Sequence, residues 1–214
     1  MSFDRMILTQ HLVLAFLLVY AVGRAFETFR KRAQLPGRIV EPYSLPLIVV
    51  AYVAFYLSLL WTVFDVNFRM PDQRFVVVGI MMVLMSIAGR HWAIKNLGMF
   101  HSIHIEIRDQ HELITSGPYQ YVRNPYYLSN AIEALGFIFT VNFSPVVMII
   151  AAPYLLLLCH RLLIEEQALQ NKFAETFSAY KSSVPRLIPR LSGVGKILFD
   201  AKLLCSRSKI KSCR

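Results

Sequence analysis

Arg161 and Glu165, in the sequence RLLIEE, are the charged residues with the clearest potential for chemistry in this chain. Residues four apart share one face of an α-helix, so a helix here would place the two side chains one turn apart on the same surface. Such a pair can be an exposed ion pair that contributes well under ~1 kcal/mol to stability. It can equally form a site in which the guanidinium binds an anionic substrate and the carboxylate binds hydroxyls or an amine.

A second stretch, HELITSGPYQYVRNPYYLSN at 111–130, combines a constrained backbone with aromatic side chains. Gly117 and Pro118 predict one turn, and Pro125 predicts another. Tyrosines and an arginine are also typical of a membrane–water interface, where the rings form an aromatic belt and Arg123 extends its charge into water. A loop held by turns at both ends, however, can fix its backbone amides and rings well enough to bind a planar polar ligand.

Three histidines, His101, His104 and His111, are the candidates for proton transfer or metal binding. No carboxylate at ligand spacing completes a metal site around them. The three cysteines have irregular spacing, which gives neither a zinc motif nor a disulfide framework. We therefore predict no metal site.

These residues belong to an unusually apolar chain, with 56% hydrophobic and 17% charged residues among its 214. A soluble domain has about 25% charged residues. Five apolar segments approach the roughly 20 residues that span a bilayer. They run over 6–29, 46–64, 75–94 and 127–141, and from 145 past 158. The fifth pattern continues as a helix to Tyr180 and stops at VPRLIP. The fourth is short and contains Glu133, whose carboxylate faces either the protein interior or the membrane surface.

The distribution of charge predicts the orientation of these segments. Lys and Arg are concentrated after the first span, at 30–38, and in the tail after Glu166. The links after the second and fourth spans show no such excess. By the positive-inside rule, the long 95–123 segment and the C-terminus are cytosolic, and the N-terminus lies on the opposite side. The net charge of +10 is therefore better explained by anionic membrane lipid than by nucleic acid.

Three motifs, GPYQYVRNPYY, RLLIEEQAL and AYKSSVPRLIP, resemble in order and spacing the isoprenylcysteine carboxyl methyltransferase family. The related phospholipid methyltransferases share parts of this pattern, and both groups are integral membrane enzymes that use S-adenosylmethionine (SAM). The resemblance covers about Leu97 to Pro189. It implies an all-α polytopic membrane protein with about five transmembrane helices, a cytosolic cofactor-binding loop and a C-terminal helical extension. The expected parts are three spans (1–94), a catalytic region with two spans (95–190) and a basic tail (191–214).

The resemblance also implies roles for individual residues. Arg161 matches the arginine that holds the substrate carboxylate, and Glu165 matches the acidic cofactor ligand. The other implied cofactor contacts are His104, His111, Glu112, Leu113, Ile114, Tyr119, Asn124, Pro125, Tyr126 and Tyr127. One departure concerns the family's usual RHP, which is RNP here. Asn124 still donates and accepts hydrogen bonds, but it does not titrate near neutral pH.

The chemistry of methyl transfer favours a carboxylate substrate. A carboxylate is already ionised at pH 7, so the site has only to align the reacting atoms and exclude water. An amine would first need deprotonation, for which only the histidines are available. We therefore predict a SAM-dependent methyltransferase that modifies a prenylcysteine-like or other lipophilic carboxylate, entering from the surrounding membrane lipids. Two alternatives are a phospholipid amine N-methyltransferase and a non-catalytic membrane binding or assembly protein on the same fold.

Overall fold

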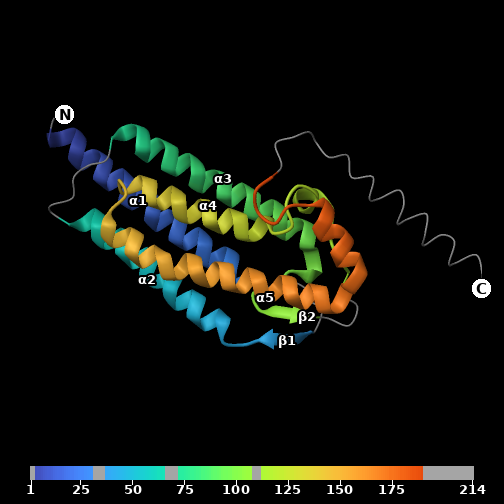
Figure 1. The fold of residues 1–214 in the computed structure, drawn as a ribbon. Coiled ribbons are helices and arrows are strands. Elements are labelled where there is room, and N and C mark those ends of the chain that lie inside the picture. Colours follow the sequence, from blue (N-terminus) through green and yellow to red (C-terminus); the bar gives the residue numbers. More distant parts are fainter. Residues whose placement is uncertain (1–2, 31–36, 66–71, 108–111, 190–214) are drawn as a thin grey trace, which may run out of the picture.

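The structure, a computed structural model, describes residues 3–30, 37–65, 72–107 and 112–189. Five α-helices dominate it (Figure 1). They are α1 (Phe3–Phe29), α2 (Ser44–Phe64), α3 (Gln73–Leu97), α4 (Pro125–Thr140) and α5 (Pro145–Ser183). Each predicted apolar segment forms one helix, and the continuation of the fifth beyond the membrane-length segment is confirmed. The all-α fold is therefore confirmed, whereas the tail and its two cysteines lie outside the described residues.

The helix boundaries follow local chemistry. The Asp72 side chain caps α3 by accepting a hydrogen bond of 3.0 Å from the backbone N–H two residues later. Pro125 and Pro145 stand in the first turns of α4 and α5, where a missing N–H leaves no helical bond unmade. Between these helices, Asn142 and Phe143 both have positive φ. The turn predicted from the sequence NFSP is therefore confirmed.

Four helices, α1, α2, α3 and α5, are long and apolar enough to cross a membrane. Helix α4 has 16 residues and is about 24 Å long, less than the ~30 Å hydrocarbon core. It packs closely along α3, since a Cβ atom at Gly79 would lie 2.5 Å from the carbonyl oxygen of Gly136. Small residues allow such close approach of membrane helices. The protein is thus an integral membrane protein whose shortest helix is largely enclosed by the others.

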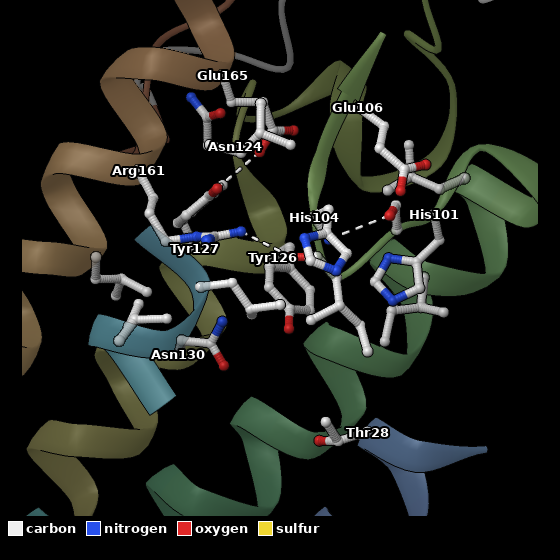
Figure 2. A pocket seen from close by; sticks show the side chains of 18 of the residues that line it. Thr28, His101, His104, Glu106, Asn124, Tyr126, Tyr127, Asn130, Arg161 and Glu165 are labelled. Carbon is white, nitrogen blue, oxygen red and sulfur yellow. Dashed lines mark hydrogen bonds between the residues drawn. The ribbon is translucent and has the colours of Figure 1, made fainter. Parts of the chain in front are cut away.

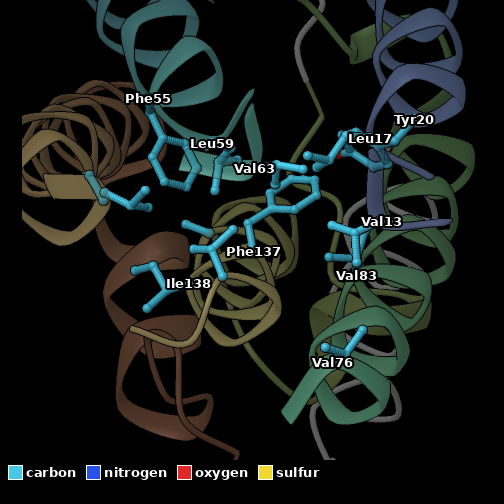
Figure 3. Close-up of a cluster of buried hydrophobic side chains, with 14 of the residues drawn as sticks. Val13, Leu17, Tyr20, Phe55, Leu59, Val63, Val76, Val83, Phe137 and Ile138 are labelled. Atoms are coloured by element: carbon cyan, nitrogen blue, oxygen red, sulfur yellow. The ribbon is translucent and has the colours of Figure 1, made fainter. Parts of the chain in front are cut away.

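The apolar core surrounds Phe137 of α4, which is fully buried (Figure 3). Its ring meets that of Tyr20 edge-on, with 4.9 Å between ring centres, and that of Phe55 at 6.4 Å. Leu17 and Leu59 complete the contact between α1, α2 and α4. Aromatic side chains bury large areas, so this cluster supplies much of the packing that holds the helices in register.

Two short strands, which the sequence did not predict, lie at one end of the bundle. They are β1 (Arg38–Glu41) and β2 (Ile105–Ile107), and they pair antiparallel. Because successive helices run in opposite directions, the N-terminus lies at the far end (Figure 1). The end of α1, the α3–α4 connection and the extension of α5 therefore meet at the strand end. The two polar regions expected to share one side lie together, and the assignment of that side to the cytosol stays a prediction.

Candidate active site

A cavity of about 570 Å³ extends from the strand end of the bundle into the space between the helices. This volume lies within the roughly 300–1,000 Å³ typical of ligand sites. We call its outer region the polar part; it is lined by His101, His104, Tyr119, Tyr127, Arg161 and Glu165. We call its deeper region, between α1 and α2, the apolar part; it is lined by Ala21, Ala25, Ile48, Val49 and Val53. Figure 2 shows how side chains from several elements converge on the cavity.

Arg161 is buried in the wall of the polar part, with 6% of its surface exposed. One terminal nitrogen donates to the Ser44 hydroxyl at 2.8 Å, and the other donates to the Ile103 carbonyl at 2.7 Å. Both acceptors are neutral, and no described carboxylate forms an ion pair with this guanidinium. A buried charge is normally paired, so Arg161 is suited to bind an anion that enters the cavity.

Glu165 lies one helical turn along α5 from Arg161 and also lines the cavity. The Tyr127 hydroxyl donates to one carboxylate oxygen of Glu165 at 2.7 Å (Figure 2). No described cation forms an ion pair with this carboxylate. The predicted placement of the two charges on one face of a helix thus agrees with the structure. Both charges remain available to a ligand.

Glu166, the next residue, faces a different set of partners and organises the loop. It accepts hydrogen bonds from Arg123 Nε at 3.1 Å, from the Asn124 side-chain amide at 2.7 Å and from Arg186 Nε at 3.0 Å. The backbone N–H of Arg123 donates to the Pro185 carbonyl at 2.9 Å, and that of Asn124 donates to the Arg186 carbonyl at 3.2 Å. The RNP motif is therefore joined to the VPRLIP motif, and Asn124 has a structural hydrogen bond as well as a place in the cavity wall. Sequence analysis identified the motifs but missed this buried carboxylate as their connection.

The Gly-Pro-Tyr turn is also held from α5. The Tyr180 hydroxyl donates to the Tyr119 carbonyl at 2.5 Å. Gly117 adopts a φ of 61°, and a Cβ atom there would lie 2.3 Å from the Asn96 side chain, so glycine suits this position on both counts. Burial raises the pKa of the Tyr119 phenol well above its ordinary value, so the hydroxyl stays protonated at physiological pH. The turn thus presents a neutral hydroxyl at the cavity.

The structure brings together most of the residues singled out from sequence. Those that line the cavity are Arg161, His104, Glu112, Leu113, Ile114, Tyr119, Asn124, Tyr126, Tyr127 and Glu165. Pro125 is buried at the start of α4 and is not part of the cavity wall. His111 lies outside the described residues. The roles assigned to these residues by resemblance stay predictions.

Two histidines stand in the polar part beside the aromatic residues. The His101 ring lies 5.7 Å from the centre of the Tyr126 ring. His104 Nδ1 is buried and has no hydrogen-bond partner among the described residues. A buried polar atom without a partner is costly, so this nitrogen is a candidate contact for a bound molecule. In the described part of the chain, no group of three or more His, Cys, Asp or Glu residues is arranged to hold a metal ion.

A network of charges lies deeper, within the membrane-spanning helices. Arg90 bonds to Glu133, and each is only 1% exposed; Arg90 also bonds to Glu27 at 2.7 Å. Arg24 donates to Glu27 at 3.1 Å and to Asn130 at 3.0 Å. Glu133 therefore faces the protein interior, and its depth relative to the membrane surface stays a prediction. Charges inside a membrane segment are expensive unless paired, and here two arginines meet two carboxylates.

Many of the residues that line the cavity fall within a stretch of sequence that matches a known family. Residues 78–171, from within α3 to within α5, match the model of the isoprenylcysteine carboxyl methyltransferase (ICMT) family. This region is therefore similar to the ICMT family. Members of the family are membrane methyltransferases. The match includes the Gly-Pro-Tyr turn and both Arg161 and Glu165, but it excludes α1, α2 and the VPRLIP motif.

Two curated relatives carry names from metal resistance. The chain is 29% identical over 117 residues to the nickel-cobalt-cadmium resistance protein NccN of Alcaligenes xylosoxydans xylosoxydans, covering 55% of this chain and 51% of that protein. It is 28% identical over 117 residues to the cobalt-zinc-cadmium resistance protein CzcN of Cupriavidus metallidurans, covering 55% and 50%. It is 31% identical over 91 residues to the Bacillus subtilis protein YpbQ, described as uncharacterised, covering 42% and 52%. The chain thus spans about half the length of the curated relatives it matches.

Members of the ICMT family use SAM as methyl donor, and the polar part has a donor set that fits such a molecule. SAM carries an adenosine and a charged amino acid group, which require aromatic surfaces, a carboxylate and hydrogen-bond donors. Glu165, bonded by the Tyr127 hydroxyl, offers the carboxylate. His104 Nδ1, which has no partner in the described part of the chain, offers a polar contact. Tyr119 and Tyr126 add aromatic surface. The arrangement is chemically compatible with the family's cofactor.

Proposed function

We propose that this protein is a SAM-dependent membrane methyltransferase that methylates the carboxylate of a lipophilic molecule. The observation that carries the proposal is Arg161. This buried guanidinium binds only neutral oxygens within the described residues, one turn from an unpaired carboxylate and at the wall of a cavity. A permanently charged fork of this kind binds a carboxylate through two parallel hydrogen bonds.

The residues proposed to hold the cofactor are those of the polar part, with Glu165 and His104 as polar contacts and Tyr119 and Tyr126 as aromatic surface. When bound, SAM supplies an electrophilic methyl group carried on a positively charged sulfur. Glu112, Leu113 and Ile114, which resemble the family's cofactor-contacting stretch, line the same cavity. The links between Glu166, Arg123 and Arg186 would keep this region in shape before the cofactor enters.

The protein's part in the reaction is to position the substrate and to exclude water. Arg161 orients the substrate carboxylate, which needs no base because it is ionised at neutral pH. Alignment of reacting groups of this kind supplies several kcal/mol of a barrier. Arg161 must not bind the ground state too strongly, since only interactions that favour the transition state accelerate the step.

The apolar part supports a substrate with a hydrocarbon chain. Val49, Val53 and Leu57 of α2 line the cavity, yet they are 48%, 49% and 58% exposed. Residues that contribute both to a cavity and to the outer surface indicate that the cavity opens toward the lipid beside α2. A chain would enter there from the bilayer, while the polar part is reached from the strand end, which we assign to the cytosol from the positive-inside rule.

A second candidate function is N-methylation of a phospholipid amine. The observation that favours it is His104, which lines the same cavity and whose buried Nδ1 has no hydrogen-bond partner among residues 3–30, 37–65, 72–107 and 112–189. A neutral imidazole nitrogen is suited to accept a proton from an ammonium group. The buried positive charge of Arg161 disfavours a cationic substrate, and for this reason carboxyl methylation comes first.

The test is transfer of labelled methyl from SAM, by the purified protein in liposomes, to N-acetyl-S-farnesylcysteine and, in parallel, to an ethanolamine phospholipid. Base-labile label on the farnesylcysteine identifies a methyl ester and supports the proposal. Base-stable label on the phospholipid transfers the assignment to amine methylation. Binding of SAM without labelling of either acceptor retains the methyltransferase assignment and rejects these substrates. Absence of SAM binding would reject the enzyme assignment and favour a binding or assembly protein.

A further inference from the structure

Arg24 belongs to α1, outside the region of family similarity, and it lines the apolar part of the cavity. Its two terminal nitrogens donate to Glu27 and to Asn130, and its guanidinium lies 5.7 Å from the centre of the Tyr52 ring. The side chain is 15% exposed. A guanidinium carries five N–H groups, and among the described residues its bonds to Glu27 and Asn130 use two of them. The other N–H groups can donate to a molecule in the cavity that Arg24 lines.

The charges around Arg24 cancel one another. Arg24 and Arg90 are matched by Glu27 and Glu133, and the Arg90–Glu133 pair is buried away from the cavity wall. Arg24 therefore offers hydrogen-bond donors without an excess of positive charge. A neutral oxygen suits these donors better than a second carboxylate, which would bring an uncompensated charge into the membrane interior. Arg161 is the opposite case, since no described carboxylate pairs with it.

The depth of Arg24 relative to Arg161 follows from the helices that hold their partners. Tyr52 lies eight residues from Ser44 along α2, which corresponds to about 12 Å. Because Arg161 bonds to Ser44 and the Arg24 guanidinium lies over the Tyr52 ring, the two guanidinium groups are separated by up to roughly 12 Å along α2. A small molecule spans this distance with a carboxylate and a second polar group a few bonds away.

We propose that Arg24 and Asn130 form a second substrate subsite, which binds a neutral oxygen acceptor located near the carboxylate held by Arg161. The inference rests on the proposed carboxyl methylation and specifies its substrate class. That class is lipophilic monocarboxylates that carry an amide carbonyl, an ester carbonyl or a hydroxyl close to the carboxylate, in preference to plain hydrocarbon acids. The walls of the apolar part, formed by Ile48, Val49 and Val53, accommodate the hydrocarbon chain. Substrate selectivity is thus a property of α1 and α2, whereas the polar part comes largely from the family region.

The experiment compares two acceptors that differ only in the neutral group. N-acetyl-S-farnesylcysteine has an acetamido carbonyl beside the carboxylate, and 3-(farnesylthio)propanoate lacks it. We expect the wild type to use the first with a kcat/KM about ten- to a hundredfold higher, the effect of one hydrogen bond from a charged donor. Arg24→Met, which retains the length and apolar stem, is expected to remove this preference, so that the kcat/KM values for the two acceptors become equal within about threefold. Arg24→Lys should restore part of the preference.

Arg90→Met is the matched control, because it removes a guanidinium of the same network that does not line the cavity. This variant is expected to lower the thermal stability of the protein and to change kcat/KM for the two acceptors by the same factor. The subsite is refuted if Arg24→Met also lowers kcat/KM equally for the two acceptors. It is likewise refuted if the wild type has the same kcat/KM for both.

Thermal stabilisation by each acceptor, measured with the unlabelled proteins in detergent, separates the subsite from the reaction. Suppose that the wild type transfers no methyl group to either acceptor. Stronger stabilisation by N-acetyl-S-farnesylcysteine, lost in Arg24→Met, would then reject carboxyl methylation of these acceptors while supporting the subsite. Equal stabilisation of the wild type by both acceptors would refute the subsite, whatever the activity.

Discussion

Arg161→Lys provides the most direct test of how the protein binds its substrate. A bidentate arginine–carboxylate pair contains two charge-assisted hydrogen bonds, each contributing about 1.5–3 kcal/mol. Lysine keeps the positive charge and one of these bonds, so the expected loss is about 1.5–3 kcal/mol, or roughly 10- to 150-fold in kcat/KM. Little of this energy is screened by solvent, because Arg161 is only 6% exposed.

The assay is methyl transfer to N-acetyl-S-farnesylcysteine at varied concentrations of acceptor and of SAM. We expect the apparent KM for the acceptor to rise far more than the apparent KM for SAM. Ser44→Ala is the matched control, since it removes one neutral partner of Arg161 at 2.8 Å and leaves the charge in place. This control should change kcat/KM by less than about fivefold, corresponding to one ordinary hydrogen bond. Equal increases in both KM values in Arg161→Lys would show that Arg161 does not select the carboxylate.

Further variants test the cofactor site and the fold. Glu165→Ala should weaken SAM binding by about tenfold or more, the effect of one charge-assisted bond, as measured by equilibrium dialysis; unchanged affinity would remove Glu165 from the cofactor site. Asn124→His should leave SAM affinity within about threefold, because an imidazole N–H can replace the amide that donates to Glu166 at 2.7 Å, and gross loss of binding would show that the loop is not arranged as in the family. Gly136→Val should destabilise the protein by about 1–3 kcal/mol or more, since its Cβ would lie 2.8 Å from the Gly79 carbonyl, and an unchanged melting temperature would contradict the α3–α4 packing. Ala174→Gly should raise the melting temperature by about 2–4 °C, because Ala174 has a φ of 40° inside α5; a lower melting temperature would contradict backbone strain there.

Sequence alone predicts the helices because their signals are local. A run of apolar residues long enough to span a bilayer has few alternatives to a helix, and prolines such as Pro125 and Pro145 mark helix starts through their own geometry. The placement of Arg161 and Glu165 on one face is also local, since it depends only on helical periodicity. These features therefore appear in the structure close to their expected positions.

The remaining features depend on contacts between distant parts of the chain. Arg90 bonds to Glu133, which is 43 residues away, and to Glu27, which is 63 residues away. No local pattern selects these partners among the other charges of the chain. The pairing of β1 with β2 likewise joins two segments of three or four residues that are too short to show strand periodicity. Such contacts become visible only once the helices are packed.

The adjacent carboxylates Glu165 and Glu166 show how charge compensation separates structural from ligand-binding groups. Successive residues on a helix point about 100° apart, so the two face different surroundings. Glu166 is neutralised by Arg123 and Arg186, at 3.1 and 3.0 Å, and a ligand would have to displace one of them to bind. Within the part of the chain that the structure describes, Glu165 receives only a hydroxyl bond from Tyr127, and its helical neighbour Arg161 binds only neutral oxygens. Where a fold buries charges and compensates most of them internally, the uncompensated ones are the groups that gain most from a charged ligand. By this criterion the proposed binding of a methyl donor and a carboxylate acceptor is expected on the face of α5 that carries Arg161 and Glu165.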